Sequence, residues 1–187
     1  PAARSSQGAY VDNLLLLLVR VISSLGSVLT AAAVPLYLAG EHREEWIPFS
    51  VMGLATGRII ATLFILPRLS HLSSRRILVA TSTIGGSLVL GAAAILTFYP
   101  ALSHPLYYFL LSSCATALAT VDDSVAQAAL CDLQSGARWV HLDSSLFTLC
   151  RVLAPGLTMG LLVLVKNGLP TVLVIDGLSY FVSALLF

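Results

Sequence analysis

Six apolar stretches, each long enough to cross a lipid bilayer as a helix, make up most of this chain. They cover residues 14–38, 47–69, 77–98, 106–130, 142–165 and 169–187, and short polar segments separate them. A helix needs about 20 apolar residues to cross about 30 Å of hydrocarbon, whereas a barrel strand is about half as long and alternates in polarity. The stretches therefore predict an all-α membrane protein, with six transmembrane helices in a single bundle.

The composition excludes most other classes of protein. Hydrophobic residues make up 57% and charged residues 10% of the 187 residues, against about 25% charged residues in a soluble domain. The formal net charge of +1 offers no basic surface to nucleic acid. Walker, HExxH and GxSxG patterns are absent, and the four histidines have no metal-ligand spacing. We therefore expect no enzyme activity, cofactor, metal site or nucleic-acid partner.

The placement of positive residues predicts the orientation of the helices. Five arginines fall in the N-terminal segment and in the second and fourth connections, which share one side: Arg4, Arg68, Arg75, Arg76 and Arg138. The connections of the other side hold only Arg43 and Lys166. Because positive residues favour the cytoplasmic side, we expect a multi-pass protein of the cell (inner) membrane with both termini in the cytoplasm.

Charged residues inside the apolar stretches are the candidate functional residues. Arg58 and Arg151 fall near the middle of the second and fifth stretches, and Arg20 and Asp176 lie less deep in the first and sixth. A charge at bilayer depth costs at least about 2.5–3.5 kcal/mol, so it needs a partner or a wet cavity. Buried ion pairs would only fix the packing, and Arg20 could also extend to the membrane surface. We favour a cavity, because the first, second, third and fifth stretches have no central acid, and we predict a pathway for an anionic or zwitterionic solute.

Small residues recur four apart in three of the stretches. The pairs are Gly53 and Gly57, Ser82 and Gly86, Ser87 and Gly91, and Gly156 and Gly160. This spacing puts a flat strip on one helix face, which lets a neighbouring backbone approach closely. The strips therefore predict close packing between helices.

Four segments carry patterns that recur in one family of transporters. Residues 20–27 read RVISSLGS, similar to R-x-x-S-x-L-G-[SD], and residues 127–133 read QAALCDL, similar to the end of P-x-x-Q-A-L-L-P-D-L. Residues 151–156 (RVLAPG) and 176–184 (DGLSYFVSA) are similar to R-x-x-G-P and [ND]-x-x-S-F-x-x-S-A. Ser124 and Cys131 replace family prolines, and Ala154 replaces a glycine. The chain resembles the N-terminal half of a major facilitator superfamily transporter, in the branch of macrolide-efflux and siderophore-export proteins.

The connection between the second and third stretches departs from the family pattern. The superfamily usually has G-x-x-x-D-R-x-G-R-R there, and residues 67–76 read PRLSHLSSRR, so the acid is missing in either possible alignment. In the family this loop latches the two halves through charge contacts. We predict that Asp122 or Asp123, late in the fourth stretch, replaces this gating contact by pairing with Arg75 or Arg76. The alternative is that both acids are solvated at a helix end.

The resemblance implies a function and a larger protein. It implies twelve spans in two halves that rock around a central site, with the first, second, fourth and fifth helices lining the cavity. Asp176 would then sit on a peripheral helix. The chain starts at Pro1 without a Met and ends at Phe187 in an apolar run, so we expect a fragment that lacks the C-terminal six-helix half. The implied function is proton-coupled export of a small organic solute by alternating access; the alternative is a non-transporting membrane scaffold or assembly subunit.

Overall fold

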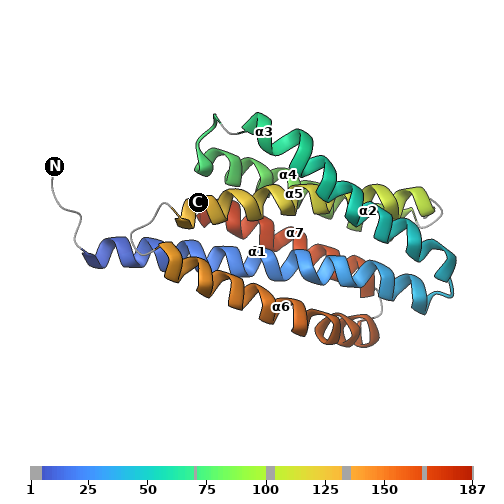
Figure 1. The fold of residues 1–187 in the computed structure, drawn as a ribbon. Coiled ribbons are helices and arrows are strands. Elements are labelled where there is room, and N and C mark those ends of the chain that lie inside the picture. Colours follow the sequence, from blue (N-terminus) through green and yellow to red (C-terminus); the bar gives the residue numbers. More distant parts are fainter. Residues whose placement is uncertain (1–5, 70, 100–103, 132–135, 166–167, 187) are drawn as a thin grey trace.

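The described part of the chain consists of helices joined by short connections. The computed structural model describes residues 6–69, 71–99, 104–131, 136–165 and 168–186, and these ranges contain no strand (Figure 1). The prediction of an all-helical chain is therefore confirmed. The long helices are α1 (Ser6–Gly40), α2 (Ile47–Ile60), α4 (Ser74–Phe98), α5 (Pro105–Cys131), α6 (Gly136–Leu164) and α7 (Gly168–Leu186).

Three shorter elements complete the first half of the chain. The 3₁₀ turn η1 (Glu44–Trp46) leads into α2, and the π-helical segment η2 (Ala61–Ile65) and the short α3 (Leu66–Leu69) continue α2 without a break. The predicted second stretch, 47–69, therefore corresponds to one continuous helix. The first and fifth helices begin earlier than expected, because the polar residues before the apolar stretches are already helical.

Among the residues that the structure describes, five helical segments are long and apolar enough to cross a membrane. They are Leu17–Gly40, Glu44–Leu69, Ser74–Phe98, Arg138–Leu164 and Gly168–Leu186. The helix α5 has 27 residues but is not among these segments. It carries two adjacent aspartates and several hydroxyl side chains, which lower its apolar character. The composition of α5 alone therefore does not identify it as a membrane span.

The long helices run up and down through one bundle. As a result, the start of α1 and the end of α7 lie at the same end of the molecule (Figure 1). The helix α1 packs against α6 and α7, α4 packs against α5 and α7, and α5 packs against α2. The largest buried cluster lies among α1, α4, α5, α6 and α7 and includes the fully buried Tyr108 and Tyr180.

The strip of Gly53 and Gly57 brings α2 into backbone contact with α5. A Cβ atom at Gly53 would lie 2.5 Å from the carbonyl oxygen of Phe109, and one at Gly57 would lie 2.1 Å from that of Ser113. The Ser113 hydroxyl donates a hydrogen bond of 3.1 Å to the carbonyl oxygen of Gly53. The predicted role of this strip in close packing is confirmed.

The remaining strips of small residues differ in whether another helix packs closely against them. A Cβ atom at Gly86 would lie 3.1 Å from the carbonyl oxygen of Gly177, so this part of α4 packs closely on α7. Nothing in the described structure lies within 4 Å of the corresponding positions at Gly91, Gly156 and Gly160. The packing prediction is therefore wrong for these three glycines within this bundle.

Candidate functional site

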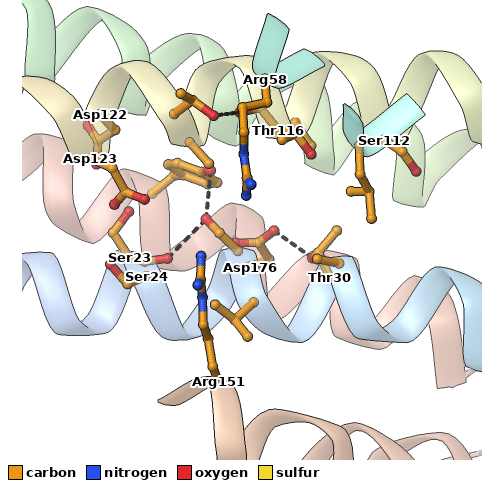
Figure 2. A pocket seen from close by; sticks show the side chains of 18 of the residues that line it. Ser23, Ser24, Thr30, Arg58, Ser112, Thr116, Asp122, Asp123, Arg151 and Asp176 are labelled. Atoms are coloured by element: carbon orange, nitrogen blue, oxygen red, sulfur yellow. Dashed lines mark hydrogen bonds between the residues drawn. The ribbon is translucent and has the colours of Figure 1, made fainter. Parts of the chain in front are cut away.

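A cavity of about 190 Å³ opens between five of the helices, α1, α2, α5, α6 and α7 (Figure 2). Its polar lining consists of hydroxyl and charged side chains: Ser23, Ser24, Ser27, Thr30, Arg58, Ser112, Thr116, Thr120, Asp122, Asp123, Arg151, Asp176 and Tyr180. A cavity of about 150 Å³ is large enough to hold benzene. The space therefore suits a small organic solute.

Arg58 and Arg151 face each other across this cavity. Arg58 extends from α2 and Arg151 from α6, and their guanidinium groups point toward each other (Figure 2). Both side chains are exposed, and no carboxylate in the described structure lies within 4 Å of either. The Arg151 Cζ lies 4.3 Å from the centre of the Phe147 ring, a cation–π arrangement. The structure thus supports the cavity for these two arginines and does not contain the alternative ion pairs.

The helices are irregular next to both arginines. The π-helical segment η2 starts three residues after Arg58, and such segments often occur at functional sites. Proline has no amide hydrogen to donate to the carbonyl four residues earlier. For Pro155 in α6 that carbonyl belongs to Arg151. Each arginine is therefore carried by a turn that departs from regular α-helical hydrogen bonding.

Arg20, which was also predicted to lie in the solute pathway, is not among the residues that line this cavity. Its Nε donates a short hydrogen bond to Oδ1 of Asp143, and its Nη1 lies 3.3 Å from Oδ1 of Asp123. The same Nη1 donates a 3.2 Å hydrogen bond to the carbonyl oxygen of Asp123. Arg20 is 3% and Asp143 is 2% exposed, so Arg20 does not extend to the membrane surface either. This cluster, which we call the Arg20 clamp, joins α1, α5 and α6.

Sequence reasoning missed Asp143 because it lies at the edge of the predicted fifth stretch. The helix α6 begins at Gly136, so Asp143 is about two turns inside the helix rather than at its start. One signal was available in the sequence. Arg20 and Asp143 both lie near the starts of their stretches, which the up-and-down order puts at the same end of the bundle.

The expected pairing of Asp122 or Asp123 with Arg75 or Arg76 does not occur in the structure. Asp122 is 7% exposed and accepts a 3.1 Å hydrogen bond from the Thr81 hydroxyl, and Asp123 pairs with Arg20. Arg75 and Arg76 lie exposed in the first turn of α4. The two acids lie more than two turns, about 12 Å, before the end of α5. Asp122 is level with Thr81, more than one turn further along α4 than Arg76. The difference in depth explains the correction, and burial of Asp122 also excludes its solvation at a helix end.

Asp176 borders the cavity although the family scheme puts its helix at the periphery. Its Oδ2 accepts a 2.5 Å hydrogen bond from the Thr30 hydroxyl on α1 (Figure 2). Its Oδ1 is buried and has no hydrogen-bond partner among the described residues. A Cβ atom at Gly26 would lie 2.5 Å from this Oδ1, so only glycine lets α1 approach α7 this closely.

The hydroxyl lining was the second feature that sequence reasoning missed. Ser112, Thr116 and Thr120 on α5 recur four residues apart and line one side of the cavity. Residues at this spacing share one helix face, so the pattern was visible in the sequence. In the part of the chain that the structure describes, no three His, Cys, Asp or Glu side chains gather as a metal-ligand set.

No protein-family model, curated protein or solved structure matches this chain significantly. The resemblance to major facilitator transporters therefore rests on the sequence patterns alone.

Proposed function

We propose that this chain forms the six-span half of a secondary-active transporter, with α5 as the sixth span, and that its cavity binds a small anionic solute during alternating access. One observation carries the proposal. Arg58 and Arg151 face each other across a hydroxyl-lined cavity, inside a bundle of apolar helices, without a carboxylate within 4 Å in the described structure.

The chemistry of arginine favours an anionic ligand at this position. A guanidinium group stays protonated, and at bilayer depth it must face water, an acid or a solute. Its planar donors match the oxygen atoms of a carboxylate, sulfonate or phosphate. Two such groups on opposite walls can hold one anion between them. The hydroxyl groups around them can bind further polar atoms of the solute or its hydration water.

The positions of the two arginines also suit a moving site. Their helices, α2 and α6, have the smallest buried share of the five candidate spans. The helix α2 packs mainly on α5, and α6 packs mainly on α1, so the two arginines belong to different helix pairs. Movement of one pair relative to the other would change the distance between the arginines, and thereby the affinity for the anion.

The first prediction concerns the membrane topology, with the termini and the connection after α3 in the cytoplasm. Single cysteines at Ser73 and Glu44, both exposed, should be labelled from opposite sides in a variant that lacks the three native cysteines. We expect an impermeant external reagent to modify the cysteine at Glu44 and to leave that at Ser73 unmodified. The reverse labelling pattern would contradict this orientation.

The second prediction tests the anion site directly. The protein in lipid nanodiscs is titrated calorimetrically with acetate, lactate, malonate and methanesulfonate. We expect Arg58→Gln and Arg151→Gln each to weaken anion binding by about tenfold or more, because a charged hydrogen bond contributes about 1.5–3 kcal/mol. Arg68→Gln is the matched control, since Arg68 is exposed, lies outside the cavity and donates to the carbonyl oxygen of Phe64.

The binding and flux measurements together distinguish the presence of an anion site from transport activity. If the wild-type protein binds none of the four anions, or if the cavity variants bind as well as the Arg68 variant, the anion site is wrong. Flux of the bound anion into liposomes that contain the protein tests transport itself. Binding without flux would favour the alternative role as a non-transporting membrane subunit.

A further inference from the structure

Asp176 is the most deeply buried acid that borders the cavity, and no cation in the described structure neutralises it. Its side chain is 1% exposed, and no arginine or lysine nitrogen lies within 4 Å of its carboxylate in the described residues. Asp123 and Asp143 both contact Arg20. Asp122 has no arginine or lysine nitrogen within 4 Å in the described residues either, but it is more exposed than Asp176, at 7%. A carboxylate buried without a cation is costly, so a positive occupant is required.

The space around Asp176 selects the kind of occupant. Its Oδ1 has no hydrogen-bond partner and almost no accessible surface, and it lies against the backbone of Gly26. An ammonium group or a metal ion does not fit against this oxygen without separating α1 from α7. A proton needs no additional space. The carboxyl group also borders the cavity, as Thr30 does, so a proton can exchange with water on that side.

We propose that Asp176 is a proton-binding site and that protonation there strengthens anion binding between Arg58 and Arg151. The second part rests on the proposed function; the first does not. The polar and titratable groups on the helices around Asp176 determine how easily it binds a proton. On α1 they are the hydroxyl of Thr30 and the backbone of Gly26, and on α7 itself Tyr180 follows one turn later.

The remaining neighbours set the charge of the cavity around Asp176. The part of α4 that packs on α7 presents Gly85 and Gly86, which do not titrate. The same cavity is also lined by the two arginines of α2 and α6 and by two adjacent acids of α5, Asp122 and Asp123. No histidine lines the cavity. Asp122 and Asp176 are therefore the two lining acids without an ion-pair partner in the described structure. Of these two, Asp176 is the one with a buried oxygen that has no hydrogen-bond partner there.

The sign of the coupling follows from these charges. An ionised Asp176 repels an anion in the cavity and reduces the positive potential of the two arginines. A protonated Asp176 removes this repulsion, so proton and anion bind cooperatively, and each raises the affinity for the other by the same factor. In alternating access, two ligands that bind cooperatively to the same state of the protein are carried across the membrane in the same direction. The geometry thus favours transport of proton and anion in one direction, in contrast with the proton-driven export that the family resemblance implies.

Infrared spectroscopy of the protein in lipid tests the proton site without any ligand. We expect the carbonyl band of a protonated carboxylic acid at neutral pH in the wild-type protein and its loss in Asp176→Asn. Asp122→Asn is the matched control, because Asp122 is also buried and also lines the cavity. The proposal is overturned if the band is absent from the wild-type protein or persists in Asp176→Asn, as it would if Asp122 carried the proton.

Anion binding at different pH values tests the coupling. Methanesulfonate is the probe, because it does not titrate near neutral pH. Its affinity for the wild-type protein should fall by up to about tenfold per pH unit on the alkaline side. Asp176→Asn should bind with the high affinity at every pH, whereas Ser112→Ala should keep the pH dependence. An unchanged pH dependence in Asp176→Asn overturns the coupling, and failure of methanesulfonate to bind at any pH contradicts the anion site while the infrared result still decides the proton site.

Discussion

Arg20→Leu should lower the stability of the folded bundle by about 3–5 kcal/mol, because it leaves two acids of the Arg20 clamp without their cation. Asp143 is 2% exposed, and its Oδ1 is the acceptor for Arg20 Nε. The other carboxylate, Asp123, has a side chain that is 33% exposed and borders the cavity, so water can solvate it in part. The measurement is unfolding in mixed micelles, with the folded fraction followed by circular dichroism.

A double variant distinguishes the loss of the ion pair from the loss of packing. Arg20→Leu combined with Asp143→Leu removes both buried charges and should regain most of the stability, because replacing a buried pair with apolar groups is often neutral. Arg68→Leu, at an exposed arginine, should change stability by less than about 0.5 kcal/mol. If Arg20→Leu is as stable as Arg68→Leu, the Arg20 clamp does not hold the three helices together.

Gly57→Ala should destabilise the bundle by about 3 kcal/mol, at the upper end of the usual range for overpacking. The added methyl group would lie 2.1 Å from the carbonyl oxygen of Ser113 and 2.9 Å from its carbonyl carbon. These are backbone atoms of α5, which cannot rotate away as a side chain can. The helix α2 must therefore shift, and Arg58, the next residue, must shift with it. Anion binding should weaken together with stability.

Two other glycines provide matched controls for this substitution. Gly91→Ala and Gly160→Ala add the same methyl group in helices where nothing in the described structure lies within 4 Å. Alanine is favoured over glycine inside a helix by about 0.5–1 kcal/mol, so these variants should be as stable as the wild type or slightly more stable. Equal stability of Gly57→Ala and Gly91→Ala would contradict close packing of α2 on α5.

The positions of the helices could be predicted because they depend on local sequence. Apolar stretches of membrane-spanning length end at polar or proline-containing segments, and all six correspond to long helices. Helix ends were less predictable, since α1 and α6 start well before their apolar stretches. Of the six predicted membrane spans, five correspond to helices in the described residues that are long and apolar enough to cross a membrane. In α5 the inward-facing polar groups lower the average that such a prediction uses.

Within the candidate site, a residue's position was predictable only where it does not depend on a partner from another helix. Arg58 and Arg151 are placed in the cavity as expected, because no acid is available near the centres of their helices. The partners of Arg20 depend on the rotation of α5 and α6 about their axes, which the sequence pattern does not determine. The same holds for Asp122 and Asp123, which are adjacent in the chain but face different helices. Contacts between helices thus limited the prediction.

The Arg20 clamp also bears on how the chain is synthesised and inserted. Arg20 and Asp143 are 123 residues apart, so α1 leaves the ribosome long before its main partner exists. During that interval the membrane-insertion machinery must accommodate an arginine that costs about 2.5–3.5 kcal/mol in lipid. A nascent chain that stops before α6 should therefore hold α1 less firmly in the membrane than a chain that includes it. We therefore expect α6 to complete the insertion of the first helix.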